Sequence, residues 1–386
     1  MKTIYLDNAA TTQVDDSIIK EMNLYHKEKY GNASSIHLIG QEAKRALEES
    51  RHVIAKSINA KDDEIYFTSG GTEANNWVLK GLFFANGNKG HIITSKIEHD
   101  CILNSCKWLE EQGAKVTYLD VDAKGFIDLK KLEKAITKDT LVVSIIHGNN
   151  EIGTIQNLKE IGEICKRKKV YLHTDACQSY TKTDINVKKL NIDLITLNAH
   201  KIHGPKGVGA LYIRDGIEMS PLLHGGGHEK GMRSGTENIP GIVGMAKAVK
   251  NSKTRYVKDM YYLRDYLIKG ILKMPDTRLN GAEGKDRLCN NINICFNNIE
   301  GEAIGGYLES FGICSSTGSA CSSHTLESSH VLKAIGLSNL EANSSLRLSL
   351  SKYSTKEEID YTLKALHKIV IKLRRISPIK FGGKKK

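Results

Sequence analysis

The sequence predicts an α/β fold built around a mostly parallel central sheet, with a second, smaller α+β domain. The chain has 386 residues, and single cores stop growing at roughly 250–300 residues. Between about residues 60 and 215, short β-rich runs alternate with amphipathic helical runs, a pattern typical of parallel strands joined by crossover helices. From about residue 290 the pattern changes to a strand, helices, another strand and a final helix. These observations favour two domains of different architecture.

The larger domain has seven candidate strands, which are short β-rich runs bounded by turn-forming or polar residues. They span residues 65–67, 91–95, 115–119, 141–147, 170–176, 194–200 and 210–213. Amphipathic periodicity predicts helices at 102–112 and 158–167. In such a sheet, ligands bind in the loops that follow the carboxyl ends of the strands. We therefore expect the catalytic side chains in these loops.

The rest of the chain is predicted to form a connector and the smaller domain. Residues 240–273 are expected to be one long, charged helical connector. The smaller domain should contain strands at 292–296 and 346–350 and a helix at 356–374. The predicted division is a large domain over residues 16–255, a small domain made of residues 1–15 and 256–375, and a basic tail over residues 376–386.

Charge and hydropathy disfavour several classes of protein. The net charge is +12, but seven basic side chains and no acidic one lie between Lys372 and Lys386. A solvated tail is the simpler interpretation, with docking to RNA or to an acidic protein as the alternative, so direct nucleic-acid binding is not expected. The sequence has neither an apolar run of roughly 18 residues that could span a membrane nor the apolar core of a signal peptide at its start. We therefore expect a cytoplasmic protein without membrane contact.

The eight cysteines include no C-x-x-C pair, which disfavours a zinc ribbon or a thioredoxin-type site. Most are expected to be buried, reduced thiols, and no metal site is predicted. Cys321 differs because small and polar residues surround it on both sides, so we expect an exposed thiol in a mobile loop.

Polar residues of complementary kinds follow three of the strands. The turn around Gly71 opens a helix, whose N-terminus favours a phosphate group, although a plain turn is the simpler reading. Asp175 could cap a helix or pair with a protonated ring nitrogen. Lys201 follows a buried strand, where desolvation lowers the pKa of an amine and prepares it for a Schiff base. Together these residues favour pyridoxal 5'-phosphate over NAD or ATP, whose glycine-rich motifs are absent.

Nine short segments, in one order over essentially the whole chain, resemble NifS/IscS-type cysteine desulfurases. They are YLDNAATT at 5–12, GNASSIH at 31–37, SGGTEANN at 69–76, EH at 98–99, NNEIG at 149–153, HTD at 173–175, AHKIHGPKGVG at 199–209, RSGTEN at 233–238 and GSAC at 318–321. The resemblance implies a fold-type I pyridoxal-phosphate-dependent transferase. It also implies a homodimer with active sites at the subunit interface.

The resemblance further implies roles for individual residues. Lys201 would bind the cofactor covalently, Asp175 would pair with its pyridinium nitrogen, Gln178 would bond its phenolic oxygen, and His99 would stack on the ring and act as acid and base. The remaining contacts fall into two groups. The phosphate would be contacted by Gly71, Thr72, Asn198 and His200, together with Thr236 of the other subunit. The substrate would be bound by Asn8, Asn150 and Arg347, and Asn150 would also lie near the cofactor. Asn198 departs from the family, which usually has a small hydroxyl residue there, but an amide can still donate to phosphate.

Cys321 decides the specific activity that the resemblance implies. The enzyme would convert L-cysteine to L-alanine, and the Cys321 thiolate would take the sulfur as a persulfide. An iron–sulfur scaffold or a tRNA-thiolation enzyme would then accept it. The alternatives are a selenocysteine lyase or another pyridoxal-phosphate-dependent lyase or transaminase of the same fold, and a non-catalytic sulfur-relay scaffold. The last is disfavoured because Lys201, Asp175 and Cys321 are all present.

Overall fold

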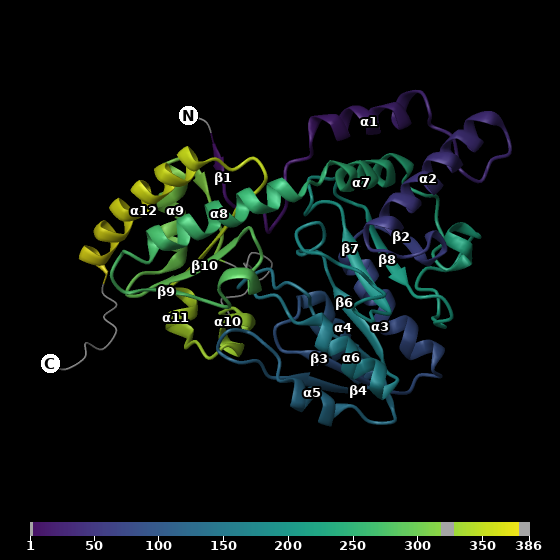
Figure 1. The fold of residues 1–386 in the computed structure, drawn as a ribbon, viewed down its shortest axis with the longest axis horizontal. Coiled ribbons are helices and arrows are strands. Elements are labelled where there is room, and N and C mark those ends of the chain that lie inside the picture. The colour runs from purple at the N-terminus through teal and green to yellow at the C-terminus, as the bar shows by residue number, and fades with distance from the viewer. Residues whose placement is uncertain (1–2, 318–327, 378–386) are drawn as a thin grey trace.

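The computed structural model describes residues 3–317 and 328–377 of the chain. It has two bodies (Figure 1), a larger one built on a long sheet and a smaller one that contains both β1 (Ile4–Tyr5) and α12 (Lys356–Ile376). No helix among the described residues is both long and apolar enough to cross a membrane.

The larger body contains a seven-stranded sheet in the order β2-β8-β7-β6-β5-β3-β4. Its strands are β2 (Ile65–Thr68), β3 (His91–Ser95), β4 (Lys115–Leu119), β5 (Thr140–Ser144), β6 (Tyr171–Asp175), β7 (Leu194–Asn198) and β8 (Gly209–Ile213). The strands from β7 to β4 are parallel, and β8 runs antiparallel to both of its neighbours. The predicted mostly parallel sheet is confirmed, with strand ends that differ from the prediction by up to three residues.

Helices cover both faces of this sheet because successive strand residues point in opposite directions. Ile92 packs in the core beneath α3 (Gly71–Ala85) and α4 (Asp100–Glu111), whereas its neighbour Ile93 packs in the core of the other face. The elements that cover or flank that second face are α1 (Asp16–Lys27), α2 (Leu38–Ser57), α5 (Leu129–Ala135), α6 (Leu158–Lys168) and α7 (Ile239–Asn251). This layering leaves the carboxyl ends of the parallel strands for the site.

The smaller body is an antiparallel sheet with helices packed on it. Its strand order is β12-β10-β9, and a parallel pair of β1 with β11 lies beside it. The elements are β9 (Thr277–Leu279), β10 (Asn291–Phe296), β11 (Ile313–Cys314), β12 (Ser345–Ser349), α8 (Thr254–Ile271), α9 (Gly301–Ser310), α10 (His330–Ala334) and α11 (Asn339–Asn343). Because β1 pairs with β11, the beginning of the chain belongs to the same body as its end.

The connector at 240–273 is two helices, so the prediction of one continuous helix was wrong. α7 ends at Asn251, and Ser252 and Lys253 are extended before α8 begins at Thr254. No Gly or Pro marks this break. α7 is also largely buried against α1 and α2 instead of forming a charged, exposed connector.

Candidate active site

Asp175 ends β6 and is buried at the edge of the sheet. Its Oδ2 accepts a hydrogen bond from Asn75 Nδ2 at 2.7 Å, and its Oδ1 accepts one from the backbone N–H of Cys177 at 2.9 Å. Both oxygens therefore act as acceptors, which is the role of an ionised carboxylate. Such an anion is what a protonated ring nitrogen needs as a partner.

Lys201 follows β7 and is half-buried. Its Nζ donates to the backbone carbonyl of Ala9 and, at 2.6 Å, to that of Ala10. Gln178 Nε2 donates to the same Ala9 carbonyl at 2.8 Å. The N-terminal segment therefore joins the amine predicted to bind the cofactor to the amide predicted to bond its phenolic oxygen.

Both Asp175 and Lys201 influence the pKa of the buried Cys177 thiol. Burial raises its pKa well above the ordinary value, the nearby Asp175 carboxylate raises it further, and Lys201 opposes that rise. A single buried thiol thus responds to both charges. Asp175 ends β6 and Lys201 follows the neighbouring parallel strand β7, so both lie at the same edge of the sheet, as the strand-end argument predicts.

The turn between β2 and α3 forms the next part of the site. Gly70 has a φ of 153°, which an L side chain rarely adopts. A Cβ on Gly71 would lie 2.7 Å from Cys177 Sγ, so this position has room only for hydrogen. Thr72 is exposed in the first turn of α3. The N–H groups of the first turn of α3, which have no preceding helical carbonyl to donate to, suit a phosphate group.

Asn198 ends β7 and lies beside this turn, and His200 follows it by two residues. Asn198 is buried, and its Oδ1 has no hydrogen-bond partner among the described residues. The His200 ring lies 3.2 Å, Nδ1 to Oγ1, from Thr11. Burial, reinforced by neighbouring lysines with Lys201 first among them, lowers the His200 pKa to about 4, so its ring is neutral at pH 7.

His99 is the N-cap residue of α4, and its Nδ1 accepts from the backbone N–H of Cys101 at 3.2 Å. The preceding Glu98 is fully buried. Burial raises its pKa to about 8, although Ser95 Oγ donates to it at 2.5 Å. Glu98 is therefore mostly protonated at pH 7 and places little negative charge beside His99.

Arg347 lies on β12, and its side chain is only 3% exposed. Its Nη1 donates to the backbone carbonyl of Asn150 at 3.2 Å, and its Nη2 donates to Asp7 Oδ1 at 3.0 Å. The guanidinium therefore lies beside Asn150, as predicted, and already has an anionic partner.

The amide of Asn8 donates to two backbone carbonyls, one of them on β12, at 3.0 and 2.8 Å. Asn8 thus ties the N-terminal segment to the smaller body.

Two predicted residues are not placed in this cluster. Thr236 is exposed and forms no side-chain hydrogen bond within the described part of the chain. Cys321 lies outside the described residues. Residues on both sides of the undescribed segment do reach the site, since Ser316 exchanges backbone hydrogen bonds with Arg347 at 3.1 and 2.6 Å and Ser329 Oγ donates to a buried carboxylate in the loop after β5 at 2.6 Å.

Three residues without a predicted role also contact the site. Lys182 is half-buried and donates to the backbone carbonyls of Gln178 at 2.9 Å and Lys201 at 3.1 Å, and desolvation lowers its pKa to about 8. Asn75 contacts Asp175, and Cys101 contacts His99. Asn75 belongs to one of the recognised segments, whereas Lys182 and Cys101 have no signal in a single sequence that distinguishes them from other lysines and cysteines.

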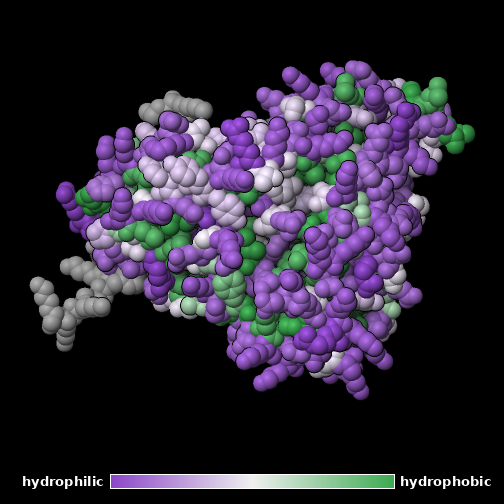
Figure 2. All heavy atoms as spheres, in the orientation of Figure 1, coloured by the Kyte–Doolittle hydropathy of each residue, from purple (hydrophilic) through white to green (hydrophobic). Residues whose placement is uncertain are grey.

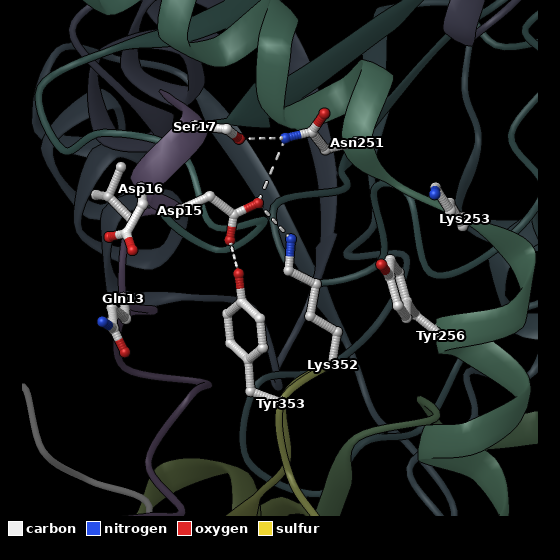
Figure 3. A pocket seen from close by; sticks show the side chains of 10 residues that line it. Gln13, Asp15, Asp16, Ser17, Asn251, Lys253, Tyr256, Lys352 and Tyr353 are labelled. Atoms are coloured by element: carbon white, nitrogen blue, oxygen red, sulfur yellow. Dashed lines mark hydrogen bonds and ion pairs between the residues drawn. The ribbon is translucent and has the colours of Figure 1, made fainter. Parts of the chain in front are cut away.

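A cavity of about 570 Å³ lies at the junction of the two bodies and is lined by other residues (Figure 3). Asp15 accepts hydrogen bonds there from Lys352 at 2.5 Å, from the hydroxyl of Tyr353 and from Asn251 at 3.5 Å. Because these interactions occupy both carboxylate oxygens, the cluster is an anchor between the bodies and not a reactive centre.

The family described as aminotransferase class-V matches residues 4–362 of this chain. A cysteine desulfurase IscS from Methanosarcina thermophila is 50% identical over 98% of this chain and 94% of its own length. The chain belongs to the class-V aminotransferases and, within them, to the cysteine desulfurases. A second cysteine desulfurase IscS, from Dictyoglomus turgidum, is 49% identical over 98% of this chain and 97% of its own length.

Solved structures of cysteine desulfurase relatives confirm the predicted fold. A NifS-like protein superimposes with a TM-score of 0.89 at 39% identity, covering 96% of this chain and 100% of the relative. The structure described as SspA in complex with cysteine has a TM-score of 0.83 at 38% identity, covering 92% and 100% of the two chains. The resemblance inferred from the nine segments is therefore confirmed.

Class-V aminotransferases and cysteine desulfurases are in general pyridoxal 5'-phosphate enzymes, and the described residues fit this cofactor. Asp175 supplies an anion, Lys201 an amine and the start of α3 free N–H groups. The Nδ2 of Asn198 lies beside the start of α3, 3.8 Å from where a Cβ on Gly71 would be, and this amide nitrogen can donate to a phosphate oxygen.

Proposed function

We propose that this protein is a pyridoxal-phosphate-dependent cysteine desulfurase that converts L-cysteine to L-alanine and holds the released sulfur as a persulfide on Cys321. The observation that carries the proposal is the meeting of Asp175, Lys201 and the start of α3 at one edge of the sheet. Family membership gives the reaction class, and these side chains provide the chemistry that it needs.

The bound cofactor would supply an aldehyde for amines and an aromatic ring that accepts electrons. Lys201 would hold the aldehyde and then release it to the substrate amine. Asp175 would keep the ring nitrogen protonated, and Gln178 would donate to the phenolic oxygen. Gly71, Thr72, Asn198 and His200 would contact the phosphate.

The substrate would bind between the two bodies. Arg347 is the planar, two-pronged donor that suits a carboxylate, and Asn150 and Asn8 lie on neighbouring segments. Asp7 currently accepts from Arg347, so the substrate carboxylate would share or replace that contact. Such an exchange keeps the guanidinium neutralised whether or not cysteine is bound.

Sulfur transfer would depend on Cys321 and on proton transfers by Lys201 and His99. The Cys321 thiolate attacks the substrate sulfur, the carbon–sulfur bond breaks, and its electron pair stays with the substrate carbon, which takes up a proton on the way to alanine. The sulfur remains on Cys321 as a persulfide. An iron–sulfur scaffold or a tRNA-thiolation enzyme would accept it in the cytoplasm.

The active enzyme would be a homodimer. Large apolar side chains are exposed around the start of α2, with exposed fractions of 66% for Tyr30, 91% for Ile36 and 83% for Leu38. Figure 2 shows this apolar surface in green at the upper right, over the connection between α1 and α2. A second subunit would cover it and bring Thr236 to the neighbouring phosphate site. Light scattering on the purified protein should give twice the 42.8 kDa chain mass, and a monomer would contradict the dimer.

The decisive experiment incubates the purified protein, with added pyridoxal 5'-phosphate, with L-cysteine and measures alanine and sulfide. Lys201→Ala should form neither product. Cys321→Ala should still bind the cofactor but should form no persulfide. Cys165→Ala, which removes a buried thiol on α6, is the matched control and should stay active. Full sulfur release by Cys321→Ala would refute the assigned nucleophile, and a marked preference for selenocysteine would favour the lyase alternative.

A further inference from the structure

A chain of hydrogen bonds connects Asp175 to His99 through Asn75 and Cys101. Asn75 lies on α3 and Cys101 on α4, two helices that pack against each other on one face of the sheet. Asn75 Nδ2 donates to Asp175 Oδ2 at 2.7 Å and to Cys101 Sγ at 3.1 Å. Cys101 Sγ in turn lies 3.1 Å from His99 Nδ1. The acid and the imidazole of the site thus share one polar connection.

The carboxylate fixes the direction of the first two bonds. Asn75 is fully buried, and a carboxylate can only accept hydrogen bonds, so the NH₂ group of Asn75 must face Asp175. Its two hydrogens are then directed at Asp175 and Cys101, while its Oδ1 has no partner in the described part of the chain. The sulfur of Cys101 therefore accepts a hydrogen from Asn75, which leaves its own S–H to donate elsewhere.

The backbone fixes the direction of the last bond. The N–H of Cys101 donates to His99 Nδ1 at 3.2 Å. A proton on that same nitrogen would point at the amide hydrogen, so Nδ1 acts as an acceptor. The Cys101 thiol is then the donor to Nδ1, and a neutral His99 ring carries its proton at Nε2.

We propose that Cys101 is a positioning residue whose thiol, together with its own backbone N–H, holds His99 in the tautomer protonated at Nε2, with Asn75 orienting the thiol. The proposal rests on the proposed function, in which His99 transfers protons. An imidazole that serves as acid and base needs a defined tautomer, which the partner of its second nitrogen sets. Here that partner is a thiol tied to the same carboxylate that would face the cofactor.

Nuclear magnetic resonance of the full-length holoenzyme with isotope-labelled histidine tests the proposal directly. The His99 signals are those that disappear in His99→Gln. We expect the wild-type signals to report a proton on Nε2. In Cys101→Ala the ratio of the two neutral tautomers should move about 3- to 10-fold toward Nδ1–H, the effect of losing one hydrogen bond. Cys101→Ser, which retains a donor and an acceptor, should resemble the wild type.

Steady-state kinetics provide a second measurement. In Cys101→Ala, kcat should fall about 3- to 10-fold with KM for L-cysteine nearly unchanged, because the thiol acts on a proton-transferring group and not on substrate binding. Cys101→Ser should recover most of kcat. Cys165→Ala, on the opposite side of the sheet, should change neither kcat nor the tautomer ratio. If Cys101→Ala fails to fold, Cys101→Val replaces it.

Two results would overturn the proposal. One is a wild-type His99 ring with its proton on Nδ1, and the other is an unchanged tautomer ratio in both Cys101→Ala and Cys101→Val. Neither result depends on turnover. If the wild type formed no alanine while His99 showed the Nε2 proton and its loss in Cys101→Ala, the proposed function would fail and the positioning role would stand.

Discussion

The Asp175 carboxylate accepts one hydrogen bond on each of its two oxygens, whereas an amide has only one oxygen that can accept. In Asp175→Asn, one of the two donors, Asn75 or the Cys177 N–H, would face another NH₂ group. We expect the folded variant to lose about 10- to 100-fold in kcat/KM, the effect of losing a charge-assisted hydrogen bond. Absorbance of the bound cofactor and alanine formation would measure it.

Asp193→Asn is the matched control for this prediction. Asp193 also accepts from a backbone N–H, that of Leu172 at 2.8 Å, and pairs with Arg214 at 2.6 Å. It lies just before the start of β7, however, whereas Asp175 lies at the carboxyl end of β6. Its replacement should lower thermal stability without a loss in kcat/KM. Equal loss of activity in both variants would show that Asp175 acts through folding alone.

At the level of single residues, the sequence predicted which polar side chains lie together after the strands, while their roles in catalysis stay predictions. The structure places Asp175, Gln178 and Lys201 together because parallel strands end at one edge of a sheet. The sequence could not predict that Cys101 and Lys182 contact the site. Their contacts depend on how α4 packs on α3 and on the turn between β6 and β7, which no local pattern in the chain encodes.

At the level of elements, the contact between the start of α3 and the turn after β6 determines what Gly71 can be. Its replacement by alanine would place Cβ 2.7 Å from Cys177 Sγ. We expect Gly71→Ala to lower the free energy of unfolding by about 1–3 kcal/mol and to weaken cofactor binding. Denaturant titration and cofactor titration would measure the two effects.

A double variant makes the prediction for Gly71 specific. Gly71→Ala with Cys177→Ala removes the clashing sulfur and should recover most of the lost stability. Gly306→Ala on α9, where an added Cβ would meet nothing within 4 Å, should instead stabilise the protein by roughly 0.5–1 kcal/mol. No recovery in the double variant would mean that the clash is not the cause.

Element prediction succeeded for the strands of the large sheet and failed where the signal was short. The run 91–95 matches β3 because three of its five residues, Ile92 to Thr94, are β-branched, which favours a strand. The pair of β1 and β11 has two residues in each strand, too few for any periodicity. At the break between α7 and α8, Ser252 bonds back to the carbonyl of Ala248 and Asn251 bonds to Ser17; only the folded chain provides the second partner.

At the level of the whole molecule, Asp15 fastens the larger body to the smaller one. Burial alone would raise its pKa, but hydrogen bonds from Lys352 and Tyr353 outweigh burial, so the pKa is lowered. A lowered carboxyl pKa stabilises the folded state above the unfolded value of about 3.9, and this contribution is lost as the pH falls through the folded value. The anchor should therefore hold at neutral pH and weaken in acid.

Asp15→Asn tests this anchor. We expect the free energy of unfolding at pH 7 to fall by about 1–3 kcal/mol, as for other charged hydrogen bonds in partly buried sites. The difference from wild type should shrink below about pH 4, where the carboxyl of the unfolded chain takes up its proton, and should vanish once the pH has fallen through the lower pKa of the folded carboxyl. Asp16→Asn is the control, because among the described residues Lys352 pairs with Asp15 and not with the neighbouring Asp16. A difference that stayed constant down to pH 3 would argue against the anchor.

The position of the N-terminal segment has a consequence for how the protein is made. Ala9 and Ala10 receive the amine of Lys201, yet the strand just before them pairs with Ile313–Cys314, and Asn8 bonds to β12. A ribosome releases the first of these residues long before the last. This stretch of the polypeptide must stay unpaired until Ser349 has been translated, so a competent active site can be completed only after β12 has left the ribosome.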